Sequence, residues 1–89
     1  MKCCSYKIGT IVEIVDSNDI RYKLVTIGKN PNDIYTRLVV SDETLIVNWE
    51  YNEITVEDLN VGDLVVAYHS NAMTMSIPPQ TNAYIIEVK

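Results

Sequence analysis

The chain has 89 residues, of which 47% are hydrophobic and 21% are charged, and its formal net charge is −5. A chain of this length buries only about 60 to 65% of the surface that it exposes when unfolded, so we expect a single core. Its composition is far from that of disordered segments. No apolar run approaches the roughly 18 residues that cross a bilayer, and the N-terminus lacks the pattern of a signal peptide. We therefore expect a cytoplasmic protein with no membrane partner.

The charge is unevenly distributed along the chain. Residues 1–40 carry a net charge of +2, whereas residues 41–89 carry a net charge of −7 and contain a single base, Lys89. A polyanionic ligand would therefore have to bind the first half. Cys3 and Cys4 are adjacent, and a disulfide between neighbours is strained, so no disulfide scaffold is expected.

In the first half, apolar residues recur at every second position, as in half-buried strands. Residues 7–15 form the first run, and its residues on one face are Ile8, Thr10, Val12 and Ile14. Residues 16–19 supply turn chemistry. In the second run, residues 20–27, we expect one set of side chains to point inward: Ile20, Tyr22 and Leu24. The opposite face would then carry Arg21, Lys23 and Val25, and residues 28–33 would form a loop.

The third strand is predicted over residues 34–40, with its side chains in two sets. One face carries Ile34, Thr36, Leu38 and Val40, and the other carries Tyr35, Arg37 and Val39. Residues 45–49 either continue this strand or form a short extra one. Thr55 is a suitable N-cap and acidic residues follow it, which predicts one or two helical turns around residues 55–60.

Two further strands complete the pattern. Residues 64–69 are apolar on both faces, which is typical of a central strand. Residues 70–82 form the longest irregular stretch, because Pro78 and Pro79 cannot donate to a sheet ladder, and the bond before Pro78 is a candidate for the cis form. The last strand, residues 83–88, is expected to turn three side chains inward: Tyr84, Ile86 and Val88.

Five strands and one short helical turn predict an all-β protein, a small five-stranded OB-like Greek-key barrel. Closure would remove the exposed edges that so small a sheet otherwise presents. We expect an N-terminal tail over residues 1–6 and a single barrel domain over residues 7–89. A meander packed on its helical turn is the alternative architecture.

Three stretches of the second half are distinctive: residues 55–63 (TVEDLNVGD), residues 72–80 (AMTMSIPPQ) and the closing run over residues 83–88. In these stretches the chain resembles small uncharacterised β-barrel domains of Gram-positive bacteria, some of which are attached to secreted or lipoprotein segments. The pattern D-L-x-V-G-D-x-V occurs in many small barrels, whereas M-T-x-S-I-P-P-Q is more particular. The resemblance implies an OB-like barrel without an established activity, and this chain departs from exported relatives in having no export signal.

The residues with catalytic or metal-binding chemistry do not form a recognised motif. His69 is the single histidine, and alone it makes neither a metal site nor a catalytic triad. A soft-ligand site for Cu(I) would have to combine His69, Cys3, Cys4, Met73 and Met75, at a spacing that matches no metal motif. Ser70 and Ser76 lie outside any nucleophile elbow. We therefore expect a non-enzyme without a metal or other cofactor, and keep a small hydrolase or metal enzyme as a third hypothesis.

The function that we favour is that of a non-catalytic binding module for a protein, a peptide or a small ligand. Its site would be the loop over residues 70–81 and the adjoining rim, where the most particular sequence lies. The residues expected there are His69, Met73, Met75, Ser76, Pro78, Pro79 and Gln80. The competing interpretation of the loop is a plug, in which Met73, Met75 and Ile77 cover the open end of the barrel.

The alternative function is binding of single-stranded nucleic acid on the outward face of the middle strands. If the alternation is right, that face carries a tyrosine among three cations: Arg21, Lys23, Tyr35 and Arg37. OB barrels bind oligonucleotides and oligosaccharides on this surface. The overall acidity disfavours a polyanionic partner, and a solvated strand face would carry the same residue types.

Overall fold

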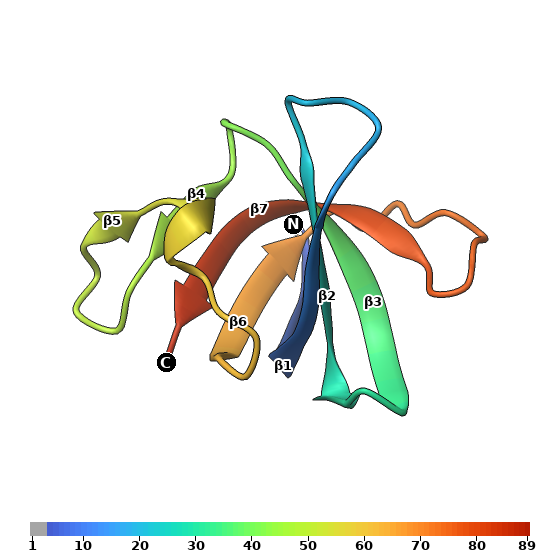
Figure 1. Cartoon of the computed structure of the whole chain (residues 1–89), viewed down its shortest axis with the longest axis horizontal. Helices are drawn as coiled ribbons and strands as arrows, with labels where there is room; N and C mark the ends of the chain where they lie inside the picture. Colours follow the sequence, from blue (N-terminus) through green and yellow to red (C-terminus); the bar gives the residue numbers. More distant parts are fainter. Residues whose placement is uncertain (1–3) are drawn as a thin grey trace.

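Strands dominate the computed structural model, which describes residues 4–89 of the chain (Figure 1). The elements in chain order are β1 (Ser5–Asp16), β2 (Lys23–Asn30), β3 (Asp33–Val40), β4 (Leu45–Val47), β5 (Glu53–Ile54), the 3-10 turn η1 (Val56–Asp58), β6 (Leu64–His69) and β7 (Gln80–Val88). β2, β1, β6 and β7 pair in that order as antiparallel neighbours, and β3 pairs with β2. The first strand thus begins at Ser5, inside the expected tail.

A parallel pairing closes the sheet into a barrel. Residues 37–39 of β3 pair with residues 80–82 of β7, so β1, β2, β3, β7 and β6 form a ring. This closure pairs two parallel strands that are distant in the chain, because β4, β5, η1 and β6 lie between them in sequence. It differs from a simple meander, whose neighbours all run antiparallel. The predicted class is confirmed as an all-β, closed five-stranded barrel with one short helical turn.

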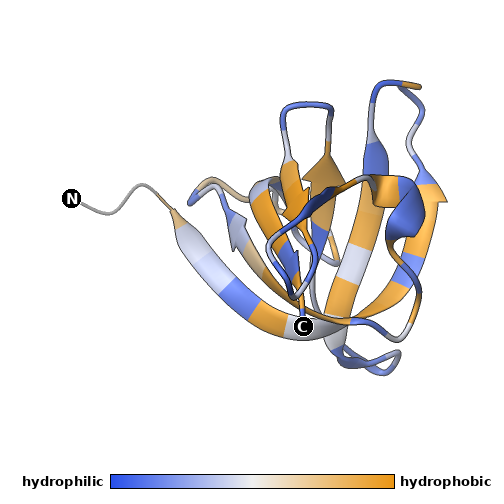
Figure 2. Ribbon diagram, turned by 90° about the vertical axis from the view of Figure 1, so that its left-hand side faces the viewer, coloured by the Kyte–Doolittle hydropathy of each residue, from blue (hydrophilic) through white to orange (hydrophobic). Residues whose placement is uncertain are grey.

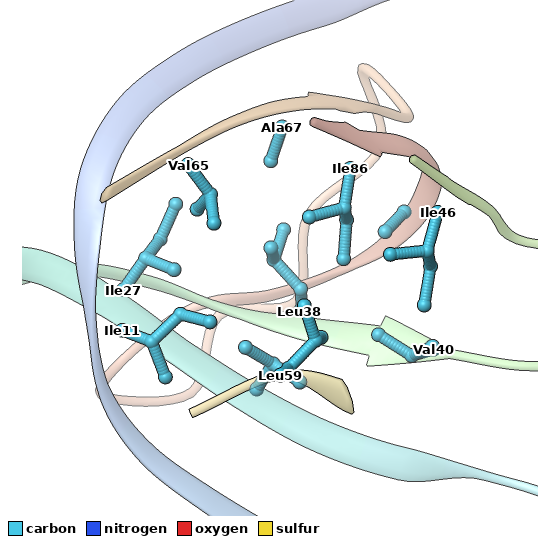
Figure 3. Close-up of a cluster of buried hydrophobic side chains, with 11 residues drawn as sticks. Ile11, Ile27, Leu38, Val40, Ile46, Leu59, Val65, Ala67 and Ile86 are labelled. Atoms are coloured by element: carbon cyan, nitrogen blue, oxygen red, sulfur yellow. The ribbon is translucent and has the colours of Figure 1, made fainter. Parts of the chain in front are cut away.

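The core fills the barrel from all five strands. Its members include Ile11, Val25, Ile27, Leu38, Val40, Ile46, Leu59, Val65, Ala67, Ala83 and Ile86. Figure 2 shows apolar residues concentrated in the strands and hydrophilic ones in the connecting segments. In Figure 3, Leu59 lies beside Leu38 and Ile11 and covers one side of the cluster. Burial of this apolar surface, at about 25 cal/mol per Å², is the main favourable contribution to folding.

The helical turn positions Leu59. The Thr55 N–H donates to Asp58 Oδ2 at 3.0 Å, which satisfies a backbone donor at the start of η1. Leu59 follows directly and is only 5% exposed. The prediction of a turn around residues 55–60 is therefore confirmed. β4 is the short extra strand, and it pairs in parallel with β7 and antiparallel with β5.

Two bulges change which residues face inward. In β1, the register with β2 shifts between Ile11 and Glu13, so Ile11 is fully buried and Ile14 also packs against the core. Ile8, expected on the face of Ile14, is 56% exposed. An inserted residue reverses the alternation beyond it. In β7 a shift opposite His69 has the same effect, so Tyr84 is exposed, contrary to the prediction, while Ile86 is buried.

The predicted faces of β2 were wrong by one residue. Tyr22 N–H donates to Asp19 O at 3.0 Å, so residues 17–22 form a turn and the strand begins only at Lys23. Val25 and Ile27 are fully buried, whereas Ile20 is 99% exposed. A one-residue offset exchanges the two faces of a strand, because side chains alternate.

The connections also differ from those expected. β2 continues to Asn30, so residues 31 and 32 make a tight turn in place of the loop predicted over residues 28–33. β7 begins at Gln80, three residues before the expected start. Within residues 4–89, no helix is long and apolar enough to cross a membrane.

Candidate ligand-binding site

The segment between β6 and β7, residues 70–79, projects from the barrel and is called the 70–79 loop below (Figure 1, orange). Its two legs are joined by backbone hydrogen bonds, in which Thr74 N–H donates to Gln80 O and Ser70 N–H donates to Asn82 O, each at 2.9 Å. Gln80 N–H donates to Thr74 Oγ1 at 2.9 Å, and the Ser76 hydroxyl donates to Pro78 O at 2.9 Å. The loop is therefore held in one shape by its own polar groups.

The base of the loop is attached to the barrel at Pro79 and at Thr81. The Pro79 carbonyl accepts from Arg37 N–H at 2.9 Å and from the Thr36 hydroxyl at 2.8 Å. The buried Thr81 hydroxyl lies 2.9 Å from Ser70 O and 2.8 Å from Ala72 O. Pro78 and Pro79 are half-buried, and the bond before Pro78 is cis. β3 and β7 thus hold both ends of the loop.

The tip of the loop presents apolar side chains to solvent. Met75 and Ile77 are each 99% exposed, and Met73 is 38% exposed. These residues therefore do not plug the barrel, and that interpretation of the loop was wrong. Ser76 is exposed beside them, whereas Gln80 is half-buried at the start of β7.

Two adjoining hollows run from the loop along the seam between β3 and β7. The first has a volume of about 290 Å³ and is lined by Val39, Ala72, Met73, Thr74, Gln80, Thr81 and Asn82. The second has a volume of about 250 Å³ and is lined by Tyr22, Val39, Ser41, Glu43, Asn82, Ala83 and Tyr84. Because they share Val39 and Asn82, they form one shallow surface between the loop and the 17–22 turn.

His69 belongs to the interior and not to this surface. It is 1% exposed, and its Nδ1 lies 2.8 Å from the Ser70 carbonyl, so Nδ1 carries the proton and donates. Its Nε2 is buried and has no hydrogen-bond partner within residues 4–89. A ligand at the loop would not touch this ring. The role of a rim contact, predicted for His69 from its position at a strand end, is therefore wrong.

The four residues expected to bind nucleic acid are spread over different elements, and each of the three cations among them contacts a carboxylate. Arg21 lies in the 17–22 turn, where its Nη2 is 2.6 Å from Asp19 Oδ2. This contact lowers the pKa of Asp19 and raises that of Arg21. Lys23 contacts Asp16 at 2.5 Å, and this hydrogen bond raises its pKa.

The other two members of that set lie on β3. The guanidinium of Arg37 is 3.9 Å from Glu13 and 3.3 Å from the Thr26 hydroxyl. Tyr35 lies towards the other end of β3, where its ring packs so close to Gly9 that a Cβ there would be 3.3 Å from Cδ2. The structure thus places an acidic partner beside each of the three cations and leaves the tyrosine apart from Arg21.

A larger cleft was not predicted from the sequence. It has a volume of about 370 Å³ and lies between the 17–22 turn, the end of β3 and the β4–β5 segment. Its charged lining residues have both signs: Arg21, Lys23, Asp42, Glu53 and Glu57. Three segments far apart in the chain meet there, so no local pattern indicates the cleft. Among residues 4–89, no cluster of three or more His, Cys, Asp or Glu side chains is arranged to hold a metal ion.

The chain matches no protein-family model, no curated protein and no solved structure. The resemblance to small barrels of Gram-positive bacteria therefore stays a proposal.

Proposed function

We propose that this protein is a non-catalytic binding module of the OB type that recognises another protein through the 70–79 loop and the adjoining seam of β3 and β7. The observation that carries the proposal is the 99% exposure of Met75 and Ile77 on a loop fixed by hydrogen bonds. Exposed apolar side chains lower the free energy of association when a partner buries them. A loop that is already ordered loses little entropy on binding.

The composition of the loop favours a protein partner. Residues 70–82 contain no charged side chain, although the chain as a whole carries a net charge of −5. The centres of protein interfaces are depleted of charged residues and enriched in methionine and aromatic residues. Met73 and the two tyrosines of the seam, Tyr22 and Tyr84, extend the apolar tip in this manner. We infer that Met75 and Ile77 insert into the partner and that the seam contacts its surface.

Assignment to the OB fold proper is supported by the ring order and by the parallel pairing of β3 with β7. OB barrels bind their ligands on the outer strand face and its bordering loops. A single-stranded nucleic acid is the less favoured ligand, because each cation of that face is already offset by a carboxylate.

The test immobilises three forms of the protein, the parent chain and two variants, and compares the proteins that each form retains from a cell extract. The Met75→Ser/Ile77→Ser variant removes the apolar tip, and Ile20→Ser is a matched control because Ile20 is also 99% exposed, in a different turn. We expect a partner that the parent chain and Ile20→Ser retain and that the double variant loses. Retention of the same partners by all three forms would contradict the proposal.

A further inference from the structure

The first half of β1 has an open edge. Residues 5–10 pair with β6, whereas β2 joins β1 only from Thr10 onward. Within residues 4–89, the side of residues 5–9 that faces away from β6 therefore has no strand partner. Such an edge leaves backbone N–H and C=O groups available for another strand. Figure 2 shows this half of β1 running along the border of the molecule next to the N-terminus.

A hollow with a mixed lining, which includes two exposed isoleucines, lies beside this edge. It is wide and open, with a volume of about 550 Å³, and is lined by Lys7, Ile8, Ile34 and Tyr35. Ile8 is 56% exposed, Ile34 40% and Tyr35 38%. These side chains come from β1 and from the start of β3, so the hollow occupies the gap in which β1 lacks a neighbour. A strand laid along β1 would cover them.

The charges at this place are unpaired. Lys7 and Lys29 form no ion pair within residues 4–89, whereas the other basic side chains of that part, Arg21, Lys23, Arg37 and Lys89, all contact carboxylates. Lys7 lines the hollow, and Lys29 follows Gly28, which pairs with Thr10 of β1. Asp33, the first residue of β3, is the acidic residue that follows the neighbouring turn. The edge is therefore locally basic on a protein that is acidic overall.

We propose that the open edge of β1 binds an extended segment of a partner protein in which acidic and apolar residues alternate. Backbone hydrogen bonds to residues 5–9 would add the segment as a further strand. Lys7 and Ile8 alternate along β1 and both border the hollow, so neighbouring residues of the added strand meet a cation and an apolar side chain in turn. The Ser5 hydroxyl, at the start of this edge, donates to Asn71 Oδ1 of the 70–79 loop at 2.5 Å. The hollow itself is lined by no residue of that loop, and the edge takes a different kind of ligand.

A lysine on a free edge can also act to prevent strand pairing. The two roles differ in their consequences. If Lys7 only protects the edge, it does not favour an acidic strand over other strands, and its removal would make the protein self-associate through β1. If Lys7 contributes to binding, its substitution lowers the affinity of the edge for the acidic segment, and the protein does not self-associate.

The experiment is an amide NMR titration of the labelled protein with the capped peptide Glu-Val-Glu-Ile-Glu-Val-Glu. We expect shifts at residues 5–9, Lys29 and Tyr35, and slowed amide exchange in residues 5–9. A peptide with lysine in place of each glutamate should bind weakly. A peptide with proline in place of both valines should also fail, because proline donates no hydrogen bond to a strand.

Variants complete the test. Lys7→Glu and Lys29→Glu should each lower the affinity for the acidic peptide by roughly tenfold at low salt, while Arg21→Glu, the same charge change in the 17–22 turn, should leave it unaltered. The Met75→Ser/Ile77→Ser variant should bind the peptide normally, which separates this proposal from that for the loop. Absence of shifts, equal binding of the lysine peptide, or self-association of Lys7→Ala through β1 would overturn the proposal.

Discussion

The backbone N–H of Gln80 donates to the hydroxyl of Thr74 at 2.9 Å, across the two legs of the 70–79 loop. The same hydroxyl lies 2.6 Å from that of Ser76, which in turn donates to Pro78 O. One threonine thus connects the start of β7 with the segment that carries Met75 and Ile77. The order of the exposed tip depends on this side chain.

Thr74→Val should therefore loosen the loop without disturbing the barrel. Loss of these hydrogen bonds should cost about 1 kcal/mol, which lowers the Tm of a domain of this size by about 4–8 °C. Amide exchange at Gln80 should become faster by a larger factor than exchange in β6, because the loop opens locally whereas β6 opens only with the whole barrel. Thr10→Val is the control, because the Thr10 hydroxyl makes no hydrogen bond within residues 4–89. Equal effects of the two substitutions would refute the role assigned to Thr74.

The second prediction concerns the stability that a side chain in the barrel interior contributes. Leu38 is fully buried on β3 among residues from several strands. Leu38→Ala should lower the free energy of unfolding by about 2–5 kcal/mol, from lost transfer energy and the remaining cavity. Leu64→Ala, at a site that is 48% exposed, should cost less than about 1 kcal/mol. Urea unfolding followed by circular dichroism measures both, and similar losses would contradict the position of the core.

Gly28 and Gly62 should respond differently to alanine. A Cβ on Gly28 would lie 2.4 Å from Asp33 O and 2.8 Å from Ile34 Cα, so the β2–β3 turn would have to move. We expect Gly28→Ala to cost about 1–3 kcal/mol or more. At Gly62 the space is open but φ is 101°, so Gly62→Ala should cost about 1 kcal/mol through backbone strain. A larger loss at Gly62 in thermal unfolding would argue against the contact at Gly28.

The 17–22 turn contains a pH-dependent contact. Hydrogen bonds that the side chain and the backbone N–H of Arg21 donate to the Asp19 carboxylate lower the pKa of Asp19 below the ordinary value of 3.8. The stabilisation is therefore complete above the unfolded-state pKa and is lost as the pH falls through the folded-state pKa. An NMR titration of the Asp19 carboxyl carbon should give a midpoint below 3.8, and Arg21→Gln should raise it. The same midpoint in both proteins would show that the ion pair does not persist in solution.

Much of the fold was predictable because alternation identifies strands well. On β3, the set predicted to share one face is buried at Thr36, Leu38 and Val40, whereas its fourth member, Ile34, is 40% exposed. The helical turn was predicted from Thr55 and the acids after it. The errors in β1 and β7 arise at bulges, which insert one residue and leave no mark in the residue types. The error in β2 arises because the turn continues to Tyr22 through a backbone hydrogen bond.

The site was predictable to a smaller extent. The prolines identified the loop, but the sequence does not distinguish apolar side chains that close a barrel from side chains that point into solvent. Met75 and Ile77 point outward because the bonds of Pro79 to β3 direct the loop away from the barrel. The open edge of β1 was also missed, because it depends on where β2 departs from β1.

Binding through the 70–79 loop is tested most directly by photo-crosslinking from the tip of the loop. A photoreactive phenylalanine analogue replaces Met75 in one form of the protein and Ile20 in another, two positions with the same exposure. If the tip of the loop binds a partner protein, position 75 gives a discrete crosslink that the unlabelled parent chain competes and Met75→Ser/Ile77→Ser does not. Position 20 gives none. Crosslinks of equal yield from both positions, or none from position 75, would contradict binding through the loop.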